Sequence, residues 1–216
     1  IFDLDDTLFY ELDYLKSGFS SVARKISNEQ GISRQDIQEL LIETYFLNLN
    51  PFKEMINRFN LKYSVEYCLN IYRTHIPKIK LSPSASVMLE ELLDQKFNLG
   101  LLTDGRSIQQ RNKIKSLKLE KYFKHIIISE EFGSMKPAKK NYIYFSKIAF
   151  SDSRIFYFVG DNIDKDFYTP NKLGWTTICL KDKGFNIHKQ NFDKSSDYIP
   201  MYTVKDYDEI LNIIID

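Results

Sequence analysis

The sequence has few cysteines and histidines and almost no excess charge. It contains 2 cysteines and 3 histidines among 216 residues. Cys68 and Cys179 show no paired spacing, so the sequence indicates neither a disulfide framework nor a zinc site. The 30 basic and 29 acidic residues leave a formal charge of +1, so no global field attracts nucleic acid or an anionic membrane. Any anion that this protein handles must therefore be held by a local site.

Long hydrophobic runs are also missing. The run from Ile155 to Val159 is far shorter than the roughly 18 residues that indicate a membrane helix. We therefore predict a cytoplasmic protein with neither a membrane nor a nucleic acid as partner, and the scarcity of cysteine suits a reducing compartment. Hydrophobic residues make up 43% of the chain, which is enough to fill a sizeable core.

Two parts of the chain differ in the secondary structure that their sequence patterns indicate. Residues 10–81 read as helical throughout, with Ser33 and Ser64 as helix caps. After Pro83 helices and strands alternate, which is typical of a parallel sheet covered on both faces. We predict an α/β fold, with a Rossmann-like parallel sheet and helices on both faces, formed by residues 1–9 and 82–216. An all-helical domain at 10–81 is inserted into it.

The expected elements of the α/β part follow from the periodicity. Residues 1–4 read as the end of a buried strand, and the part after Lys181 reads as a loop until a helix at 210–215. Asp164 is expected to stabilise the start of the helix that it opens. Between these ends we predict strands at 97–102, 126–129, 155–159 and 176–180, and helices at 84–95, 107–117, 138–150 and 164–173.

Acidic residues follow two of the predicted strand segments, the one at 1–4 and the one at 155–159. Ligands bind outside the carboxyl ends of strands in open α/β sheets. We therefore expect these acidic residues to gather at that edge of the sheet. Two bare carboxylates about 4 Å apart repel each other by roughly 4 kcal/mol at an effective dielectric near 20, so the cluster needs cations. Lys136 supplies one charge, and a divalent ion with oxygen ligands such as Mg²⁺ would supply two more. The carboxylates are those of Asp3, Asp5, Asp161 and Asp166.

These residues resemble the haloacid dehalogenase superfamily of phosphohydrolases, which use an aspartate nucleophile. Four motifs appear in order: Asp3-Leu4-Asp5-Asp6-Thr7, Thr103, Lys136, and Gly160-Asp161 with Asp166. The helical insert directly follows the first motif, as in members with an inserted helical cap. The segment 129–133 before Lys136 is similar to the nucleotidase-like and phosphoglycolate-phosphatase-like branches. Asp-x-Asp-x-Thr alone is a weak motif, but four motifs in order, each near a strand end, are strong.

The resemblance implies catalytic roles for four residues. Asp3 would attack phosphorus and become an aspartyl phosphate. Asp5 would protonate the leaving oxygen and then deprotonate the attacking water. Thr103 would donate a hydrogen bond to a phosphoryl oxygen, and Lys136 would neutralise charge on the nucleophile and the phosphoryl group.

The resemblance also implies the cofactor and its ligands. Mg²⁺ would be held by the Asp3 carboxylate, the Asp5 backbone carbonyl and the Asp161 carboxylate. Asp166 would orient these ligands rather than bind the ion.

We also predict that Thr103, Asp104, Gly105 and Arg106 contact the substrate. Thr103, Asp104 and Gly105 together form a plain turn signal, functional only through the motif they belong to. Arg106 is the best placed of the arginines to reach a substrate. The ester could be a nucleoside monophosphate, a sugar phosphate or phosphoglycolate.

Several functions fit these residues. The leading prediction is a phosphatase of a small phosphorylated metabolite, because the dehalogenase branch keeps no acid at the position of Asp5. A phosphomutase uses the same acid and differs in excluding water from the aspartyl phosphate. A signalling receiver domain shares the Asp, Thr and Lys but resembles a minimal sheet without a long insert. A protein that binds phosphate or regulates without catalysis is the remaining alternative.

Overall fold

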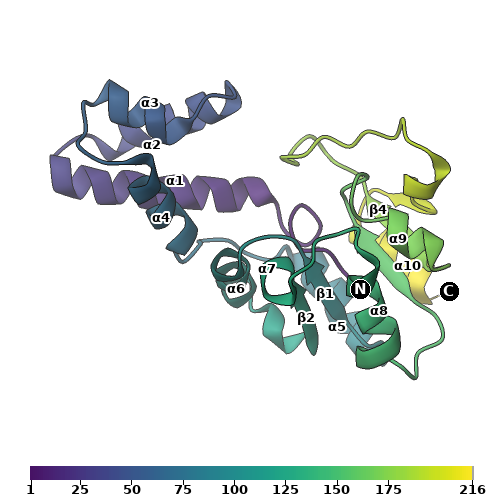
Figure 1. Cartoon of the computed structure of the whole chain (residues 1–216). Helices are drawn as coiled ribbons and strands as arrows, with labels where there is room; N and C mark the ends of the chain where they lie inside the picture. Colours follow the sequence, from purple (N-terminus) through teal and green to yellow (C-terminus); the bar gives the residue numbers. More distant parts are fainter. Residues whose placement is uncertain (216) are drawn as a thin grey trace. The chain divides into compact units, whose positions relative to one another are not determined.

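The computed structural model describes residues 1–215 and divides the chain into two compact units. One unit comprises residues 1–12 and the described residues from 80 onward, and the other comprises residues 13–79. The first unit holds all five strands that the structure describes (Figure 1). The second contains only helices and connecting loops.

Four helices make up the second unit, of which the first begins just before it. Ser33, Asn50 and Ser64 cap the last three, because each side chain accepts a hydrogen bond from a backbone amide three residues later. Apolar and aromatic side chains from all four helices are buried, including Phe19 and Met55. The predicted caps Ser33 and Ser64 are confirmed. The helices are α1 (Glu11–Gln30), α2 (Arg34–Phe46), α3 (Pro51–Arg58) and α4 (Val65–Thr74).

The α/β unit alternates helices and strands, as predicted from residue 83 onward. Its first half contains α5 (Pro83–Asp94), β1 (Gly100–Thr103), α6 (Ser107–Ser116), η1 (Leu119–Lys121), β2 (His125–Ile128) and α7 (Ser129–Phe132). Its second half contains α8 (Lys139–Tyr144), the π-helix η2 (Phe145–Ala149), β3 (Tyr157–Gly160), α9 (Tyr168–Lys172), β4 (Thr176–Leu180), η3 (Ser196–Tyr198), β5 (Tyr202–Val204) and α10 (Tyr207–Ile215).

All strand pairs are parallel. Strand β1 pairs with β2, while β4 lies between β3 and β5. The N-terminal segment joins these two groups, because Phe2 forms parallel bridges with both Leu101 and Val159. Its backbone amide donates to Gly100, and the amide of Asp3 donates to Val159. The chain's first residues therefore lie at the centre of the sheet, and Asp3 comes where this central segment ends.

Buried aromatic and aliphatic side chains form the core of this unit. Leu102, Ile127 and Phe158 come from three different strands, and Tyr142 and Phe145 of α8 and η2 pack against them. The first strand-like segment contributes Ile1 to the same cluster. Because the apolar core fixes the strands in parallel, their carboxyl ends meet at one edge of the sheet.

The strand predicted at 97–102 begins only at Gly100, and the helix predicted at 138–150 divides into α8 and η2. Two further predictions for the α/β part are wrong. The segment after Lys181 is not a loop up to residue 210, because β5 adds an edge strand and α10 begins at Tyr207. This strand has three residues, of which only Val204 is buried, so it carries too little hydrophobic alternation to be recognised.

The helix predicted at 164–173 is also shorter than expected. Helix α9 begins at Tyr168, so Asp164 does not open it. The Asp166 carboxylate accepts hydrogen bonds from the amides of Asp161 and Asn162. These bonds hold the segment before α9 in a loop, so the helix begins later in the chain than predicted. Asp164 instead forms an ion pair with Lys194.

Candidate active site

A pocket of about 110 Å³ lies at the carboxyl ends of the central strands. Asp3 follows the N-terminal segment, Thr103 ends β1 and Asp161 follows β3. Lys136 reaches the same pocket from the loop before α8. The pocket is strongly acidic, because its walls include the carboxyl groups of Asp3, Asp5, Asp6, Glu11, Asp104 and Asp161.

Lys136 is the central cation of this pocket. Its Nζ donates to Asp3 Oδ1 at 2.5 Å and to Asp166 Oδ1 at 2.7 Å. All three residues are buried, with exposed fractions of 6% for Lys136, 5% for Asp3 and 0% for Asp166. The two neighbouring carboxylates raise the pKa of Lys136 well above its usual value although its burial acts in the opposite direction. Lys136 therefore stays charged and holds Asp3 in place.

Lys136 alone does not compensate the negative charge that the carboxyl groups of Asp3 and Asp161 would carry when ionised. Burial raises the pKa of Asp3 to about 8, and the negative charges of Asp166 and Asp5 act in the same direction, against Lys136. Burial also raises the pKa of Asp161 well above its usual value, with Asp166 and Asp3 adding to the shift. Ionising both groups at neutral pH therefore requires another cation.

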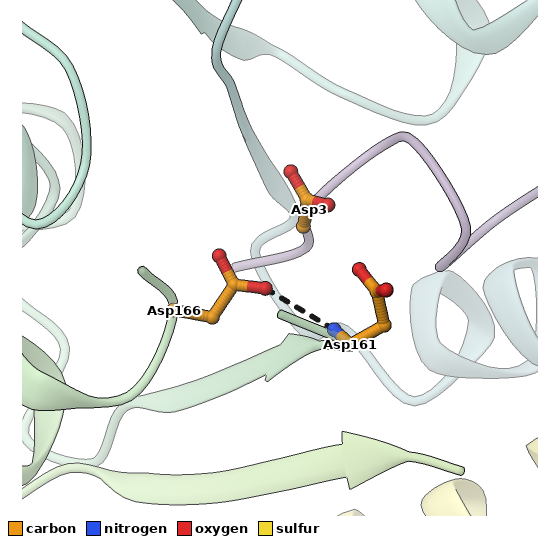
Figure 2. Close-up of side chains that lie close together, drawn as sticks. All are labelled: Asp3, Asp161 and Asp166. Carbon is orange, nitrogen blue, oxygen red and sulfur yellow. Dashed lines mark hydrogen bonds between the residues drawn. The ribbon is translucent and has the colours of Figure 1, made fainter. Parts of the chain in front are cut away.

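Asp166 organises the loop after β3. Figure 2 shows its carboxyl group beside the backbone of Asp161, to whose amide it is hydrogen-bonded at 3.1 Å. Its Oδ2 also accepts from the amide of Asn162, while its Oδ1 accepts from Lys136. Gly160 makes this approach possible, because a Cβ at that position would overlap the Asp166 carboxylate. Both oxygens of Asp166 are thus engaged within the protein.

Three carboxyl groups lie close enough to share one metal ion. Asp3, Asp161 and Asp166 each offer an oxygen, and these atoms lie within 4.8 Å of one another. Three ionised carboxylates and the single ammonium of Lys136 leave two negative charges, which is the charge that a divalent cation neutralises. An all-oxygen donor set is the kind that Mg²⁺ prefers. The residues of this pocket therefore fit Mg²⁺.

Asp161 has partners that the sequence did not reveal. Asn186 Nδ2 donates to Asp161 Oδ2 at 2.8 Å, from the loop after β4. That loop is ordered by Asp182, whose Oδ1 accepts from the backbone amides of residues 184–186. The Asx turn is a recognisable signal for a fixed loop, but nothing in the sequence indicates where the loop lies.

Asp5 has different partners from the other predicted acids. Its side chain is 19% exposed and contacts Lys113 and Gln110 of α6. Lys113 Nζ also lies 3.7 Å from Glu11 Oε1. Burial and the charge of Asp5 raise the pKa of Glu11 to about 7, against the effect of Lys113. Sequence reasoning missed Lys113, Gln110 and Glu11.

The neighbouring Asp6 has a structural role. Its Oδ1 accepts from the amide of Glu11 and its Oδ2 from the amide of Ile187. Asp6 therefore fixes the beginning of α1 and the loop that carries Asn186.

The turn after β1 is tied to the rest of the site. Thr103 is 1% exposed, and its Oγ1 accepts from Gln110 Nε2 at 2.6 Å. Asp104 Oδ1 accepts from the backbone amide of Lys136 at 3.0 Å, so it positions this lysine. The amide of Gly105 donates to Ser129 Oγ at 2.9 Å. Arg106 is different, because its side chain is 54% exposed and lies 3.8 Å from Glu130.

Comparison with known proteins identifies the family. The model of haloacid dehalogenase-like hydrolases matches residues 1–180. The chain belongs to this family. This match confirms the family that the four motifs predicted, and it confirms the prediction that the protein is an enzyme.

The similarity extends beyond the matched segment. Glyceraldehyde 3-phosphate phosphatase of Pyrococcus abyssi is 28% identical over 195 residues, which are 83% of this chain and 79% of that protein. The phosphatase of the same name from Methanocaldococcus jannaschii is 25% identical over 99% of this chain and 95% of its own length. The similarity thus includes both units described above.

A solved structure agrees with the fold of this haloacid dehalogenase-like hydrolase. The hydrolase YfnB of Bacillus subtilis, crystallised with magnesium, superposes with a TM-score of 0.68 at 19% identity. The superposition covers 100% of this chain and 97% of that one. The predicted α/β fold class is confirmed. Within residues 1–215, no helix is both long enough and apolar enough to cross a bilayer.

Proposed function

We propose that this protein hydrolyses a small phosphorylated metabolite with Mg²⁺, through an aspartyl phosphate formed on Asp3. Family membership and relatives named as phosphatases support a phosphoric monoester hydrolase. The observation that carries the residue roles is the buried ion pair of Lys136 with Asp3 beside the Asp161 carboxyl group. This arrangement combines a fixed nucleophile with strong demand for a divalent cation.

In the first step Asp3 attacks the substrate. A carboxylate oxygen of Asp3 forms a bond to phosphorus while the bond from phosphorus to the ester oxygen breaks. The proton for the departing oxygen comes from Asp5, so the metabolite leaves as an alcohol. Lys136 compensates charge on Asp3 and on the phosphoryl group, and Thr103 donates a hydrogen bond to a phosphoryl oxygen. The product of this step is the aspartyl phosphate.

In the second step water releases the phosphate. A water molecule attacks phosphorus, its proton passes to Asp5, and the bond between phosphorus and the Asp3 oxygen breaks. Asp3 is regenerated as a carboxylate, Asp5 is again protonated, and inorganic phosphate leaves. Two displacements thus replace one very slow hydrolysis.

The metal would be held by the carboxylates of Asp3 and Asp161 together with the Asp5 backbone carbonyl. Bound there, Mg²⁺ would neutralise charge on the phosphoryl oxygens and on the nucleophile. The Asp166 carboxylate already accepts hydrogen bonds from Lys136, Asp161 and Asn162, which supports an orienting role rather than direct ligation.

Phosphorylated sugars of three carbons are the first substrates to test. The two archaeal relatives that align over most of this chain are named glyceraldehyde 3-phosphate phosphatases. At 25–28% identity the reaction class carries over more safely than the ester itself, so the panel should also include a nucleoside monophosphate and phosphoglycolate.

Phosphate release from this panel, with Mg²⁺ and with a chelator, tests the proposal. We expect metal-dependent release that Asp3→Asn abolishes and that Asp94→Asn, at an exposed position in α5, leaves unchanged. A folded protein that converts none of the esters would contradict a phosphatase. Isomerisation of a sugar phosphate without release of phosphate would instead identify a mutase.

A further inference from the structure

Two side chains of α6 hold the Asp5 carboxyl group from one side. Gln110 Nε2 donates to Asp5 Oδ2 at 2.8 Å, and Lys113 Nζ contacts Asp5 Oδ1 at 2.6 Å. Each oxygen of Asp5 therefore has its own donor. A carboxyl group held at both oxygens has little freedom to rotate, which distinguishes Asp5 from a surface aspartate.

This pair of contacts is built into the interior of the protein. Gln110 is 2% exposed and Lys113 is 3% exposed, although both are polar. They lie three residues apart on one face of α6, together with the buried Ile114 and Leu117. Placing an amide and an ammonium on an apolar face is costly unless partners are provided. Asp5 is a partner of both.

The turn before α6 is shaped to admit Gln110. Gly105 has a φ of +145°, a conformation that other residues rarely adopt. A Cβ at this position would lie 3.1 Å from both Cγ and Cδ of Gln110. The glycine of the predicted turn thus leaves room for the side chain that reaches Asp5.

Gln110 also connects Asp5 to Thr103. In the ionised form that follows the first step, the Asp5 carboxylate only accepts hydrogen bonds, so the Gln110 atom that faces it is the amide nitrogen. The same nitrogen donates its second hydrogen to Thr103 Oγ1 at 2.6 Å. A hydroxyl that accepts from Gln110 keeps its own proton for another acceptor. The orientation therefore suits the donation to a phosphoryl oxygen that the proposed function assigns to Thr103.

We propose that Gln110 and Lys113 are positioning residues for the acid of the reaction. They fix the Asp5 carboxyl group and the Thr103 hydroxyl relative to each other, so that the group that protonates the leaving oxygen is aligned when the phosphate is bound. The described residues that line the pocket include neither of them, so both act through Asp5 and Thr103. This inference rests on the proposed function, in which Asp5 is the acid.

The leaving group of the substrate reveals whether the two residues act through Asp5. An alkyl phosphate needs protonation of its departing oxygen, whereas p-nitrophenyl phosphate releases a weakly basic phenolate that needs little help. We expect Lys113→Met and Gln110→Leu to lower kcat/KM for the alkyl ester by about 100-fold, the lower end of the usual contribution of an acid catalyst. For p-nitrophenyl phosphate the loss should stay below about tenfold on the same reasoning. Lys115→Met, at an exposed position on the same helix, is the matched control and should change neither value.

A second measurement separates positioning from a general structural role. In the Asp5→Asn background, Lys113→Met and Gln110→Leu should cost almost nothing further for the alkyl ester, because the group they position is gone. Equal losses for both esters, or full losses in the Asp5→Asn background, would overturn the proposal. If Lys113→Met does not fold, Gln110→Leu alone decides the matter by the same two comparisons.

Failure of the proposed function would look different. Activity that survives Asp3→Asn for both esters would remove the nucleophile from the account, whatever the α6 variants do. An unchanged ratio of the two kcat/KM values in the α6 variants, with Asp3→Asn inactive, would overturn only the positioning role.

Discussion

Two buried lysines at the candidate active site form ion pairs with different carboxyl groups. Lys136 lies 2.5 Å from Asp3 and 2.7 Å from Asp166, at the side of the pocket where Asp161 also lies. Lys113 lies 2.6 Å from Asp5 and 3.7 Å from Glu11. Both side chains are 3% exposed, and each ammonium forms ion pairs with two carboxyl groups. In the proposed function, the site thus has a nucleophile side around Asp3 and an acid side around Asp5, each with its own cation.

The two sides differ in how much negative charge their lysine leaves uncompensated. On the nucleophile side Lys136 faces Asp3 and Asp166, and Asp161 adds a third carboxyl group. On the acid side one ammonium faces the carboxyl groups of Asp5 and Glu11. Burial raises the pKa of Asp3 to about 8 and that of Glu11 to about 7. The larger deficit of positive charge explains why the metal is expected beside Asp3.

Removing Lys136 should have the largest effect. Lys136→Met leaves Asp3 and Asp166 buried without their cation, and it removes charge compensation from the reaction itself. We expect kcat to fall by about 1000-fold for every ester, the upper end of the 100- to 1000-fold loss that removal of one electrostatic contact of this kind costs. Steady-state kinetics with the alkyl and aryl esters measure this. A loss confined to alkyl esters would show that the two lysines do not differ as described.

Asp166→Asn should weaken the same side to a smaller extent. An asparagine can still accept from the amides of Asp161 and Asn162, but its NH₂ group then faces Lys136 Nζ, where Asp166 now accepts. Groups that orient metal ligands typically contribute 10- to 100-fold to metal affinity or activity. We expect a loss of about 100-fold in activity. Circular dichroism should confirm that the variant folds, and full activity would contradict the orienting role.

The charge deficit also predicts how metal binding depends on pH. With a pKa of about 8, the Asp3 carboxyl group of the metal-free protein keeps a proton that the unfolded chain loses above about pH 4. The metal-free protein therefore loses stability from this group as the pH rises between these values. Because Mg²⁺ binds the ionised carboxylate, the increase in Tm that it causes should be larger at pH 8 than at pH 6. Thermal unfolding with Mg²⁺ and with chelator tests this, and an increase that shrinks as the pH rises would contradict it.

Asn186→Leu should have the smallest effect. The side-chain amide of Asn186 donates to Asp161 Oδ2 at 2.8 Å but leaves the charges of the site unchanged. We expect the Kd for Mg²⁺ to rise by about tenfold, the lower end of the range for groups that orient ligands. Titration of the Tm with Mg²⁺ measures this, with Asn191→Leu in the same loop as the control. An unchanged Kd would show that the loop does not support Asp161.

The sequence predicted the nucleophile side better than the acid side. Asp3, Asp161 and Lys136 each come at a strand end or just before a helix, so the parallel sheet alone brings them together. Lys113 lies within a polar helix, where one lysine among several reads as a surface residue. The available signal was that Gln110 and Lys113 share a helical face with Ile114 and Leu117.

The loop after β4 could not be placed from the sequence. Asn186 reaches Asp161 because Asp182 folds the intervening residues into a turn and Asp6 accepts from the amide of Ile187. These contacts join positions far apart in the chain, and local propensity carries no information about them. The same reasoning explains why the short edge strand β5 was missed, since its place depends on pairing with β4.

Covalent labelling of the nucleophile tests the central claim most directly. The native enzyme is mixed with an excess of ³²P-labelled glyceraldehyde 3-phosphate and Mg²⁺, quenched in acid within milliseconds, and the label on the protein is counted with and without hydroxylamine. We predict label on Asp3 that hydroxylamine removes and that Asp3→Asn lacks. A native enzyme that turns over without any acid-stable label, or label that persists in Asp3→Asn, would contradict the account.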